Sequence, residues 1–251
     1  MVLHINIRSF NSKIRSFCQL INLLDYKFDA VVLSEIWAYN ITYYKNILPG
    51  YNLYYKLPTD TKVGGVGIFV KDCYCVHELD SFSISSTESC KVENLWLEIT
   101  RFGNKVILGG IYRHPNHNIL DFTSKFEDEL NKILSQRIPC VVAGDFNIDL
   151  LKFDNHTATK DFLHSLLTNN FTPTVLLPSR ITSKSTSLID HIYINKGQKN
   201  NSAWFDSHIK SDNLLTYISD HLPNFTLILN NPTDDIKLRP KVRIFFQKQL
   251  N

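Results

Sequence analysis

Polar residues stand at the ends of several apolar runs in this sequence. The apolar stretch 138–143 ends in Gly144 and Asp145, and Asn147 follows two positions later. Residues i and i+2 of an extended chain project from the same side, so Asp145 and Asn147 are expected to point together at the rim of a core. Gly144 has no Cβ and would let another backbone or a ligand come close. The alternative is an Asx turn that simply closes the strand.

Two more carboxylates interrupt strand-like runs. In "DAVVLSEIW", Glu35 is expected on the same side as Val31 and Leu33, which would bury its carboxylate unless a cation or a metal meets it. Asp190 in "SLIDHIYIN" should likewise face inward and need a partner. His221 in "SDHLPNF" could be that partner, because a carboxylate that holds one imidazole nitrogen leaves the other free to address a substrate.

Each of these residues also has a purely structural explanation when it is taken alone. Glu35 could pair with a lysine, and His221 could be an ordinary hydrogen-bonded turn histidine. Asn6 in "HINIR" and Tyr112 in "GGIYRHP" also place hydrogen-bonding groups at or near strand ends, where either alone would be structural. The agreement among several strand ends is what indicates one shared site.

The elements that must position these residues are those of a single α/β domain. The chain has 251 residues, of which 43% are hydrophobic and 20% charged, so it can bury one large core. Helical spacing of apolar residues is clearest over 14–24 and 122–134. The predicted strands are 2–8, 29–35, 50–56, 63–70, 92–101, 104–112, 138–145, 188–194 and 223–229. Because few helices separate successive strands, mixed or antiparallel sheets with helices outside them are predicted, and not a doubly wound parallel sheet.

Composition excludes several classes of protein. The formal net charge of +3 is too small to identify an anionic partner by itself. The five cysteines include no CxxC pair and sit mostly in apolar stretches, which fits buried thiols in a reducing compartment better than disulfides or a zinc site. No apolar run approaches the ~20 residues that span a bilayer, and the first residues contain no secretory signal. The protein is therefore expected to be nuclear or cytoplasmic, not secreted, and without a membrane partner.

The character of the chain changes near residue 231. Residues 231–251 contain two prolines, an acidic pair and then five cations between Lys237 and Lys248. They are predicted to form a basic linker or tail, either a solvated terminus or an arm that touches nucleic acid. The folded domain is expected to span residues 1–230.

Several segments, taken in chain order, resemble the endonuclease/exonuclease/phosphatase superfamily, which includes apurinic endonucleases and pancreatic-type DNases. They are "HINIRS" with Asn6, "LSEIW" with Glu35, "GGVGIFV" at 64–70, "GGIYRHP" with Tyr112, "GDFN" at 144–147, "LIDHIYI" at 188–194 and "SDHLP" at 219–223. More narrowly, "NIRS", "LSE.W", "PSRIT" and "RPKVRIF" are similar to the endonuclease domain that precedes the reverse transcriptase in non-LTR, LINE-type retrotransposons. No polymerase follows here, so the chain would be an isolated or truncated copy of that domain, or a host gene derived from one.

The resemblance implies a DNase-like fold, a four-layer α/β sandwich in which two mixed β-sheets lie face to face with helices outside. The active site would open at one edge of the sheets, where the polar strand ends converge. The glycines of "GGVGIFV" would allow close sheet packing, which is favoured over a phosphate cradle.

The resemblance also implies a metal site. Glu35, with help from Asn6, would hold a divalent metal, and Asp220 would support the metal side. Carboxylate and amide oxygens with one nearby histidine suit a hard cation, so Mg²⁺ is expected, and Mn²⁺ should substitute for it.

Other positions would carry the chemistry on a phosphodiester. By the same resemblance, Asp145 would orient and deprotonate the attacking water, and Asn147 would steady that water and the phosphate. His221, held by Asp190, would donate to a non-bridging phosphoryl oxygen, and Tyr112 would lie against the same phosphate. A phosphodiester repels hydroxide and releases a poor leaving group, so positioning and charge neutralisation must supply most of the acceleration.

The expected function is metal-dependent nicking of double-stranded DNA that leaves 3′-hydroxyl and 5′-phosphate ends, with no obligate protein partner. The candidates for DNA contact are cations near the site: Arg113, Arg180, Lys184 and Lys62. Residues 179–187 could form a hairpin that enters a groove, or an exposed polar loop. Two alternatives stay open. One is a phosphatase of the same superfamily that acts on phosphoinositides or lipid head groups, and the other is a catalytically decayed module that binds nucleic acid.

Two features depart from the resemblance. Only five residues precede Asn6, so the first strand is expected to be held less firmly than in relatives. His114 and Asn116 follow Tyr112 in "YRHPN", and the sequence assigns them no role.

Overall fold

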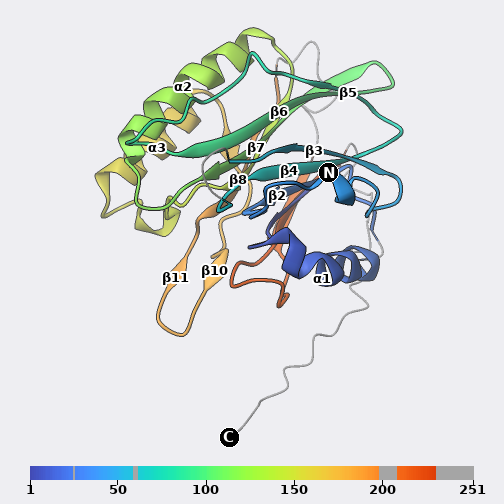
Figure 1. Ribbon diagram of the computed structural model, residues 1–251. Coiled ribbons are helices and arrows are strands. Elements are labelled where there is room, and N and C mark those ends of the chain that lie inside the picture. The colour runs from blue at the N-terminus through green and yellow to red at the C-terminus, as the bar shows by residue number, and fades with distance from the viewer. Residues whose placement is uncertain (25, 59–61, 198–207, 230–251) are drawn as a thin grey trace, which may run out of the picture.

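The chain folds into four layers, with two β-sheets face to face between layers of helix (Figure 1). The structure is a computed structural model that describes residues 1–24, 26–58, 62–197 and 208–229. The tail expected at 231–251 lies outside these residues. The helices are α1 (Phe10–Leu23), α2 (Ile119–Ser135) and α3 (Thr157–Thr168), with the short 3₁₀ helices η1 (Thr42–Tyr44) and η2 (Leu150–Lys152). Within the described ranges, no helix combines the length and the apolar character needed to cross a membrane.

Both sheets are mixed. The first has the strand order β13 (His208–Asn213), β14 (Asn224–Leu229), β1 (Val2–Asn6), β2 (Ala30–Ser34), β4 (Val66–Lys71), β3 (Tyr51–Lys56). The second has the order β5 (Cys75–Glu78), β6 (Val92–Arg101), β7 (Asn104–Arg113), β8 (Cys140–Asp145), β12 (Asp190–Asn195), β9 (Thr172–Pro173). The pairs β1–β2 and β7–β8 are parallel, and their other neighbours are antiparallel. These sheets confirm the four-layer sandwich that the resemblance implied.

A separate hairpin projects from the sandwich between β9 and β12. It is formed by β10 (Arg180–Ile181) and β11 (Thr186–Ser187), which pair antiparallel. Figure 1 shows it extending away from the layers. Of the two alternatives that the sequence left open at 179–187, the structure shows the hairpin.

Apolar side chains fill the space between the sheets from both sides. Val32 and Ile68 of the first sheet and Val141 and Ile192 of the second belong to one buried cluster. Strands buried on both faces read as nearly continuous apolar runs, which is why the central strands could be located in the sequence.

Aromatic side chains hold the helices on the outer faces. On the first sheet, Phe17 of α1 stacks on Phe69 of β4 with ring centroids 5.6 Å apart. On the second, Phe126 of α2 and Phe162 of α3 each pack against Phe146, at 5.8 Å. Complete burial of one such side chain contributes about 1.5–3 kcal/mol, so these contacts fix the layers that carry the strand ends.

Several elements were not predicted from the apolar pattern. They are α3 and the strands β5, β9 and β13. The edge strand β13 reads "HIKSDN" and is largely exposed, so it carries no apolar alternation. In α3 the buried residues are few, and the apolar signal rests on Phe162 and Leu166, four positions apart.

Candidate active site

A row of polar side chains crosses the second sheet at one end of its strands. Residues directly opposite each other in paired strands project to the same face. Asp190 lies opposite Asp145, which lies opposite Tyr112. Tyr112 in turn lies opposite Glu93. Ala143, two residues before Asp145, is buried between the sheets, so the row points toward the first sheet.

Asp145 is fully buried at the end of β8. A Cβ at Gly144 would lie 1.9 Å from the backbone oxygen of Ile111, so only glycine lets the two strands approach this closely. Asp145 Oδ1 accepts a hydrogen bond of 3.0 Å from the N–H of Asn147, which is the Asx turn that the sequence left open. Asn147 has a φ of 49°, so the chain is not extended here and the prediction that both side chains project together is wrong. Its amide Nδ2 instead donates to the backbone oxygen of Arg113 at 2.7 Å.

Asn6 joins the first sheet to this row from the end of β1. Its amide Nδ2 donates to Asp145 Oδ2 at 2.8 Å and to Glu35 Oε1 at 2.9 Å. Its Oδ1 is buried and accepts no hydrogen bond within the described part of the chain. A buried oxygen without a partner costs about 1–3 kcal/mol, and a cation beside it would offset that cost.

Glu35 reaches the site by a turn of the backbone. Strand β2 ends at Ser34, and Glu35 has a φ of 56°, a left-handed conformation that costs a non-glycine residue about 1–2 kcal/mol. Val31 and Leu33 face α1, and Glu35 does not follow them. The prediction that Glu35 shares their side is therefore wrong, because the strand ends one residue earlier than the alternation assumed.

Glu35, Asp145 and His221 form a group that could hold a metal ion. One ligand atom from each lies within 4.8 Å of the others. The carboxylates of Glu35 and Asp145 supply the oxygen ligands that a hard divalent cation prefers. The residues present therefore fit a bound Mg²⁺ or Mn²⁺.

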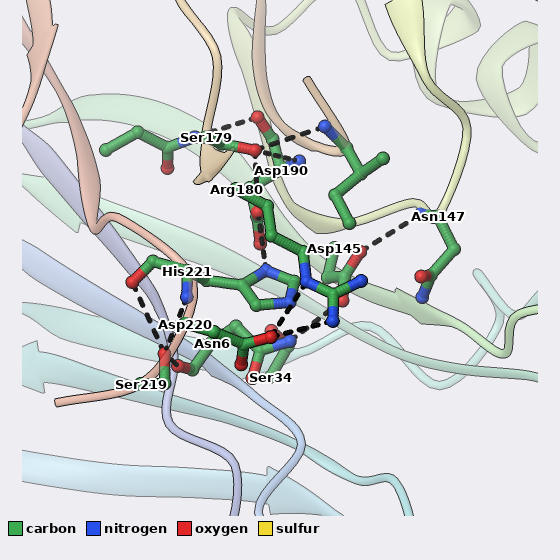
Figure 2. Close-up of polar contacts among 12 residues, drawn as sticks. Asn6, Ser34, Asp145, Asn147, Ser179, Arg180, Asp190, Ser219, Asp220 and His221 are labelled. Atoms are coloured by element: carbon green, nitrogen blue, oxygen red, sulfur yellow. Dashed lines mark hydrogen bonds and ion pairs between the residues drawn. The ribbon is translucent and has the colours of Figure 1, made fainter. Parts of the chain in front are cut away.

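His221 is held against the row by Asp190. Its Nδ1 lies 2.7 Å from Asp190 Oδ2, and Ser179 Oγ donates to the same oxygen at 2.7 Å. Figure 2 shows the imidazole reaching from its loop toward the second sheet, with Asp190 on one side. Ser179 Oγ also accepts hydrogen bonds from the backbone N–H groups of Ile189 and Asp190. These bonds fix Ser179, which in turn restrains the carboxylate of Asp190. The expected pairing of Asp190 with His221 is thus present.

Burial and mutual charge shift the pKa values of the site. Burial would raise the pKa of Asp190, but the neighbouring His221 outweighs it and the pKa lies below the ordinary value. Burial would lower the pKa of His221, and the charge of Asp190 reverses this and raises the pKa to about 9. Burial raises the pKa of Asp145 well above 3.8, and the charges of Asp190 and Glu35 add to the shift. The site therefore combines a protonated imidazole with a carboxylate of increased basicity.

Asp220 is engaged by two arginines. Arg8 NH1 lies 2.6 Å from its Oδ1, and Arg180 NH2 lies 2.7 Å from its Oδ2 (Figure 2 shows Arg180). Burial would raise the pKa of Asp220, but the hydrogen bonds from Arg180 and Arg8 outweigh it and lower the pKa to about 2. Asp220 lies outside the group formed by Glu35, Asp145 and His221. The structure therefore does not place Asp220 among the candidate metal ligands, where it was expected.

Arg113 is a structural residue and not a DNA contact. Its side chain is 2% exposed, and its guanidinium donates to the backbone oxygens of Phe146, Asn147, His114 and His117 at 2.8–3.2 Å. Strand alternation explains the error: Tyr112 faces the first sheet, so Arg113 faces α2, where its guanidinium lies 5.9 Å from the ring centre of Phe122.

The other expected DNA contacts lie at the surface. Lys184 is exposed near the tip of the hairpin, and Lys62 is exposed with its Nζ 5.6 Å from the ring centre of Tyr39. Arg180 is partly exposed and paired with Asp220. Tyr112 is 2% exposed, next to Asp145 in the row, and burial together with Glu35 and Asp145 raises its pKa.

Reasoning from the sequence missed several residues around the site. His4 is completely buried, with Nε2 3.0 Å from Ser34 Oγ and Nδ1 3.2 Å from Asn224 Oδ1. Burial lowers its pKa to about 4, so it is neutral and supports the site from within the core. Alternation places His4 on the same face as Asn6 and could have identified it. Arg8 carried no comparable signal.

Three comparisons bear on these observations. Residues 3–221 match the model of the Endonuclease/Exonuclease/phosphatase family. Among solved structures, the endonuclease domain of TRAS1, a telomere-specific non-LTR retrotransposon, is similar with a TM-score of 0.64 and 13% identity over 92% of this chain and 98% of that chain. No curated protein matches the chain in sequence.

Two further solved structures have the same fold. The 3′-5′ exonuclease NExo from Neisseria meningitidis gives a TM-score of 0.65 at 16% identity, over 91% of this chain and 99% of that chain. The human nocturnin catalytic domain with bound sulfate gives 0.60 at 18% identity, over 90% of this chain and 92% of that chain. At these identities the structures establish only the fold, whereas the family match spans most of the sequence. The chain therefore belongs to the endonuclease/exonuclease/phosphatase family.

Proposed function

We propose that this protein is a divalent-metal-dependent endonuclease that nicks double-stranded DNA and leaves 3′-hydroxyl and 5′-phosphate ends. The observation that carries the proposal is the convergence of Glu35, Asp145 and His221 within 4.8 Å, although they are far apart in the sequence. Asn6 links two of them. The similarity to a retrotransposon endonuclease domain supports DNA as the substrate.

Asp145 is the general base in this proposal. Its raised pKa makes the carboxylate a better acceptor for the proton of a water molecule. The attacking water forms a new bond to phosphorus as its proton passes to Asp145. Asn6, which donates to Asp145 Oδ2, fixes the direction in which the carboxylate presents its oxygens.

His221 stabilises the charge that develops on the phosphoryl group. With a pKa of about 9 it carries a proton at neutral pH and can donate to a non-bridging oxygen. Asp190 and Ser179 keep the ring in this orientation. The bond between phosphorus and the 3′ oxygen then breaks, and the 3′ oxygen takes up a proton from solvent. The phosphate stays on the 5′ end of the strand downstream of the nick.

In this proposal Glu35, with help from Asn6, would hold the metal. A bound Mg²⁺ would supply Lewis acidity and neutralise phosphate charge. Asp220 would act indirectly, by holding Arg8 and Arg180 beside the site. Arg180, Lys184 and Lys62 would contact DNA phosphates.

Plasmid nicking tests the proposal. Wild-type protein should convert supercoiled plasmid to the open-circle form in Mg²⁺ or Mn²⁺ and not in a chelator. Asp145→Ala should lower the rate by about 10²–10⁴-fold while DNA binding is retained. Release of phosphate from inositol phosphates without nicking would favour a phosphatase. DNA binding without metal-dependent cleavage would favour a decayed binding module.

A further inference from the structure

A second carboxylate–imidazole pair lies at the far end of the polar row. Nε2 of His114 lies 2.9 Å and 3.0 Å from the two carboxylate oxygens of Glu93. The side chains are only 12% and 14% exposed. The His114 ring also meets the ring of Tyr112 edge-on, with centroids 4.8 Å apart. The proposed reaction uses neither member of this pair.

Glu93 reaches across to a loop of the opposite sheet. The N–H of Gly65 donates to Glu93 Oε2 at 3.3 Å. A Cβ added to Gly64 would lie 2.6 Å from the same oxygen. Both glycines have positive φ, 117° and 91°. The loop that precedes β4 is therefore shaped to lie directly against this carboxylate.

The same loop holds the backbone that follows Glu35. The N–H of Trp37 donates to the oxygen of Gly64 at 2.9 Å, and the N–H of Ile36 faces the oxygen of Gly65 at 3.5 Å. Glu35 and Trp37 both have left-handed backbones, with φ of 56° and 50°. Such conformations persist only when surrounding contacts over-determine them. Contacts from Glu93 through the glycine loop thus end at Ile36 and Trp37, directly after the residue that presents a carboxylate to the site.

We propose that Glu93, braced by His114, is a positioning residue that keeps Glu35 in place to bind the metal. The inference rests on the proposed function, because it assumes that Glu35 is a metal ligand. A negative charge at Glu93 also acts on the site directly, since it is one of the charges that raise the pKa of Tyr112, after burial, Glu35 and Asp145. The test must therefore separate positioning from charge.

Direct titration with Mn²⁺ separates the two. Mn²⁺ binding is measured by electron paramagnetic resonance on wild type, Glu93→Ala and Glu93→Gln. Loss of a residue that orients a metal ligand weakens metal binding by about 10–100-fold, so Glu93→Ala should raise the Kd at least about 10-fold. Glu93→Gln keeps an oxygen for the N–H of Gly65 but removes the charge. It should restore most of the affinity.

Glu98→Ala is the matched control. Glu98 lies on the same strand and pairs with Lys105 at 2.7 Å, away from the glycine loop. Its removal should leave the Kd for Mn²⁺ unchanged. If Glu93→Ala does not fold, His114→Ala removes only the brace and should raise the Kd about threefold, less than the 10–100-fold loss expected when an orienting residue itself is removed.

The outcomes distinguish this inference from the proposed function. Unchanged Mn²⁺ affinity in Glu93→Ala, or in His114→Ala where that variant is needed, overturns the positioning role even if the wild type nicks DNA. Equal weakening in Glu93→Gln and Glu93→Ala overturns it in favour of a charge effect. A wild type that binds Mn²⁺ but cleaves no DNA defeats the proposed function, while weaker binding in Glu93→Ala alone still supports positioning. A wild type that binds no Mn²⁺ overturns both.

Discussion

The two carboxylate–imidazole pairs use the same kinds of side chain at opposite ends of one row, yet their surroundings differ. Asp190 is 1% exposed, whereas Glu93 is 12% exposed. Asp190 is fixed by Ser179 and presents His221 to Asp145 and Glu35. Glu93 instead accepts a hydrogen bond from the backbone N–H of Gly65 in the glycine loop.

The difference shows how an imidazole acquires a chemical role. His221 is raised in pKa to about 9 because a fully buried carboxylate lies against one nitrogen, and an imidazole nitrogen lies within reach of the other site carboxylates. In the second pair it is the carboxylate of Glu93 that makes the further contact, and its partner is the backbone of Gly65. The first pair can therefore hold or transfer a proton at the substrate, whereas the second pair can only position the backbone that it contacts.

Removal of each imidazole should give the largest contrast. At saturating Mg²⁺, His221→Ala should lower kcat for nicking by about 10³-fold, the range of a lost proton donor, with DNA affinity retained. His114→Ala should lower kcat by less than about 10-fold, because its effect is on metal binding. Single-turnover rates on supercoiled plasmid measure both. Comparable losses in the two variants would remove the distinction between the pairs.

Asp190→Asn should move the alkaline limit of activity. The charge of Asp190 is what raises the pKa of His221, so without it the pKa falls from about 9 toward the ordinary value. The donor is the protonated ring, so activity is lost as pH rises through this pKa, and the loss should begin at lower pH in the variant. At neutral pH kcat should fall about 10²-fold.

Rate profiles between about pH 6 and 10 measure the shift. Glu93→Gln is the control and should leave the alkaline limit where it is in wild type. An unmoved limit in Asp190→Asn would mean that another group controls it.

Strand alternation predicted the residues that lie within strands and failed just beyond strand ends. Asn6, Asp145 and Asp190 end or begin strands, and all face inward. Glu35 and Asn147 follow strand ends with positive φ, and no periodicity describes such residues. The fold could be predicted because buried strands are visible as apolar runs in the sequence. The conformation of a turn that orients a side chain depends instead on contacts from elsewhere in the chain.

The second pair could not be predicted because it depends on strand register. Glu93 and His114 are joined by the pairing of β6 with β7, which places Glu93 opposite Tyr112. Sequence alone locates both strands but does not fix which residues face each other. Arg113 is different: alternation from Tyr112 already places it on the helix-covered face, so the expectation of DNA contact was avoidable.

Gly64→Ala should test the glycine loop through stability. A Cβ would lie 2.6 Å from Glu93 Oε2 and would sit at a φ of 117°, so the free energy of unfolding should fall by about 1–3 kcal/mol. In a Glu93→Ala background the collision with Glu93 is gone and only Nε2 of His114, at 3.0 Å, stays close, so the added loss should be smaller. Urea unfolding of the four variants measures this coupling. Strictly additive losses would mean that Glu93 does not contact the loop in solution.

The smallest expected effect concerns which end of the row meets DNA. Lys184 lies at the Asp190 end, because its hairpin starts beside Ser179, and Lys62 lies at the Glu93 end, just before the glycine loop. Each alanine variant should weaken DNA binding a few-fold and reduce the slope of log affinity against log salt by about 1, as expected for one lost phosphate contact. Lys105→Ala, at the other end of β7 from Tyr112, should leave the slope unchanged. If the slope changed only in Lys184→Ala, DNA would contact only the His221 end of the row. The Glu93–His114 pair would then serve only to support the metal site.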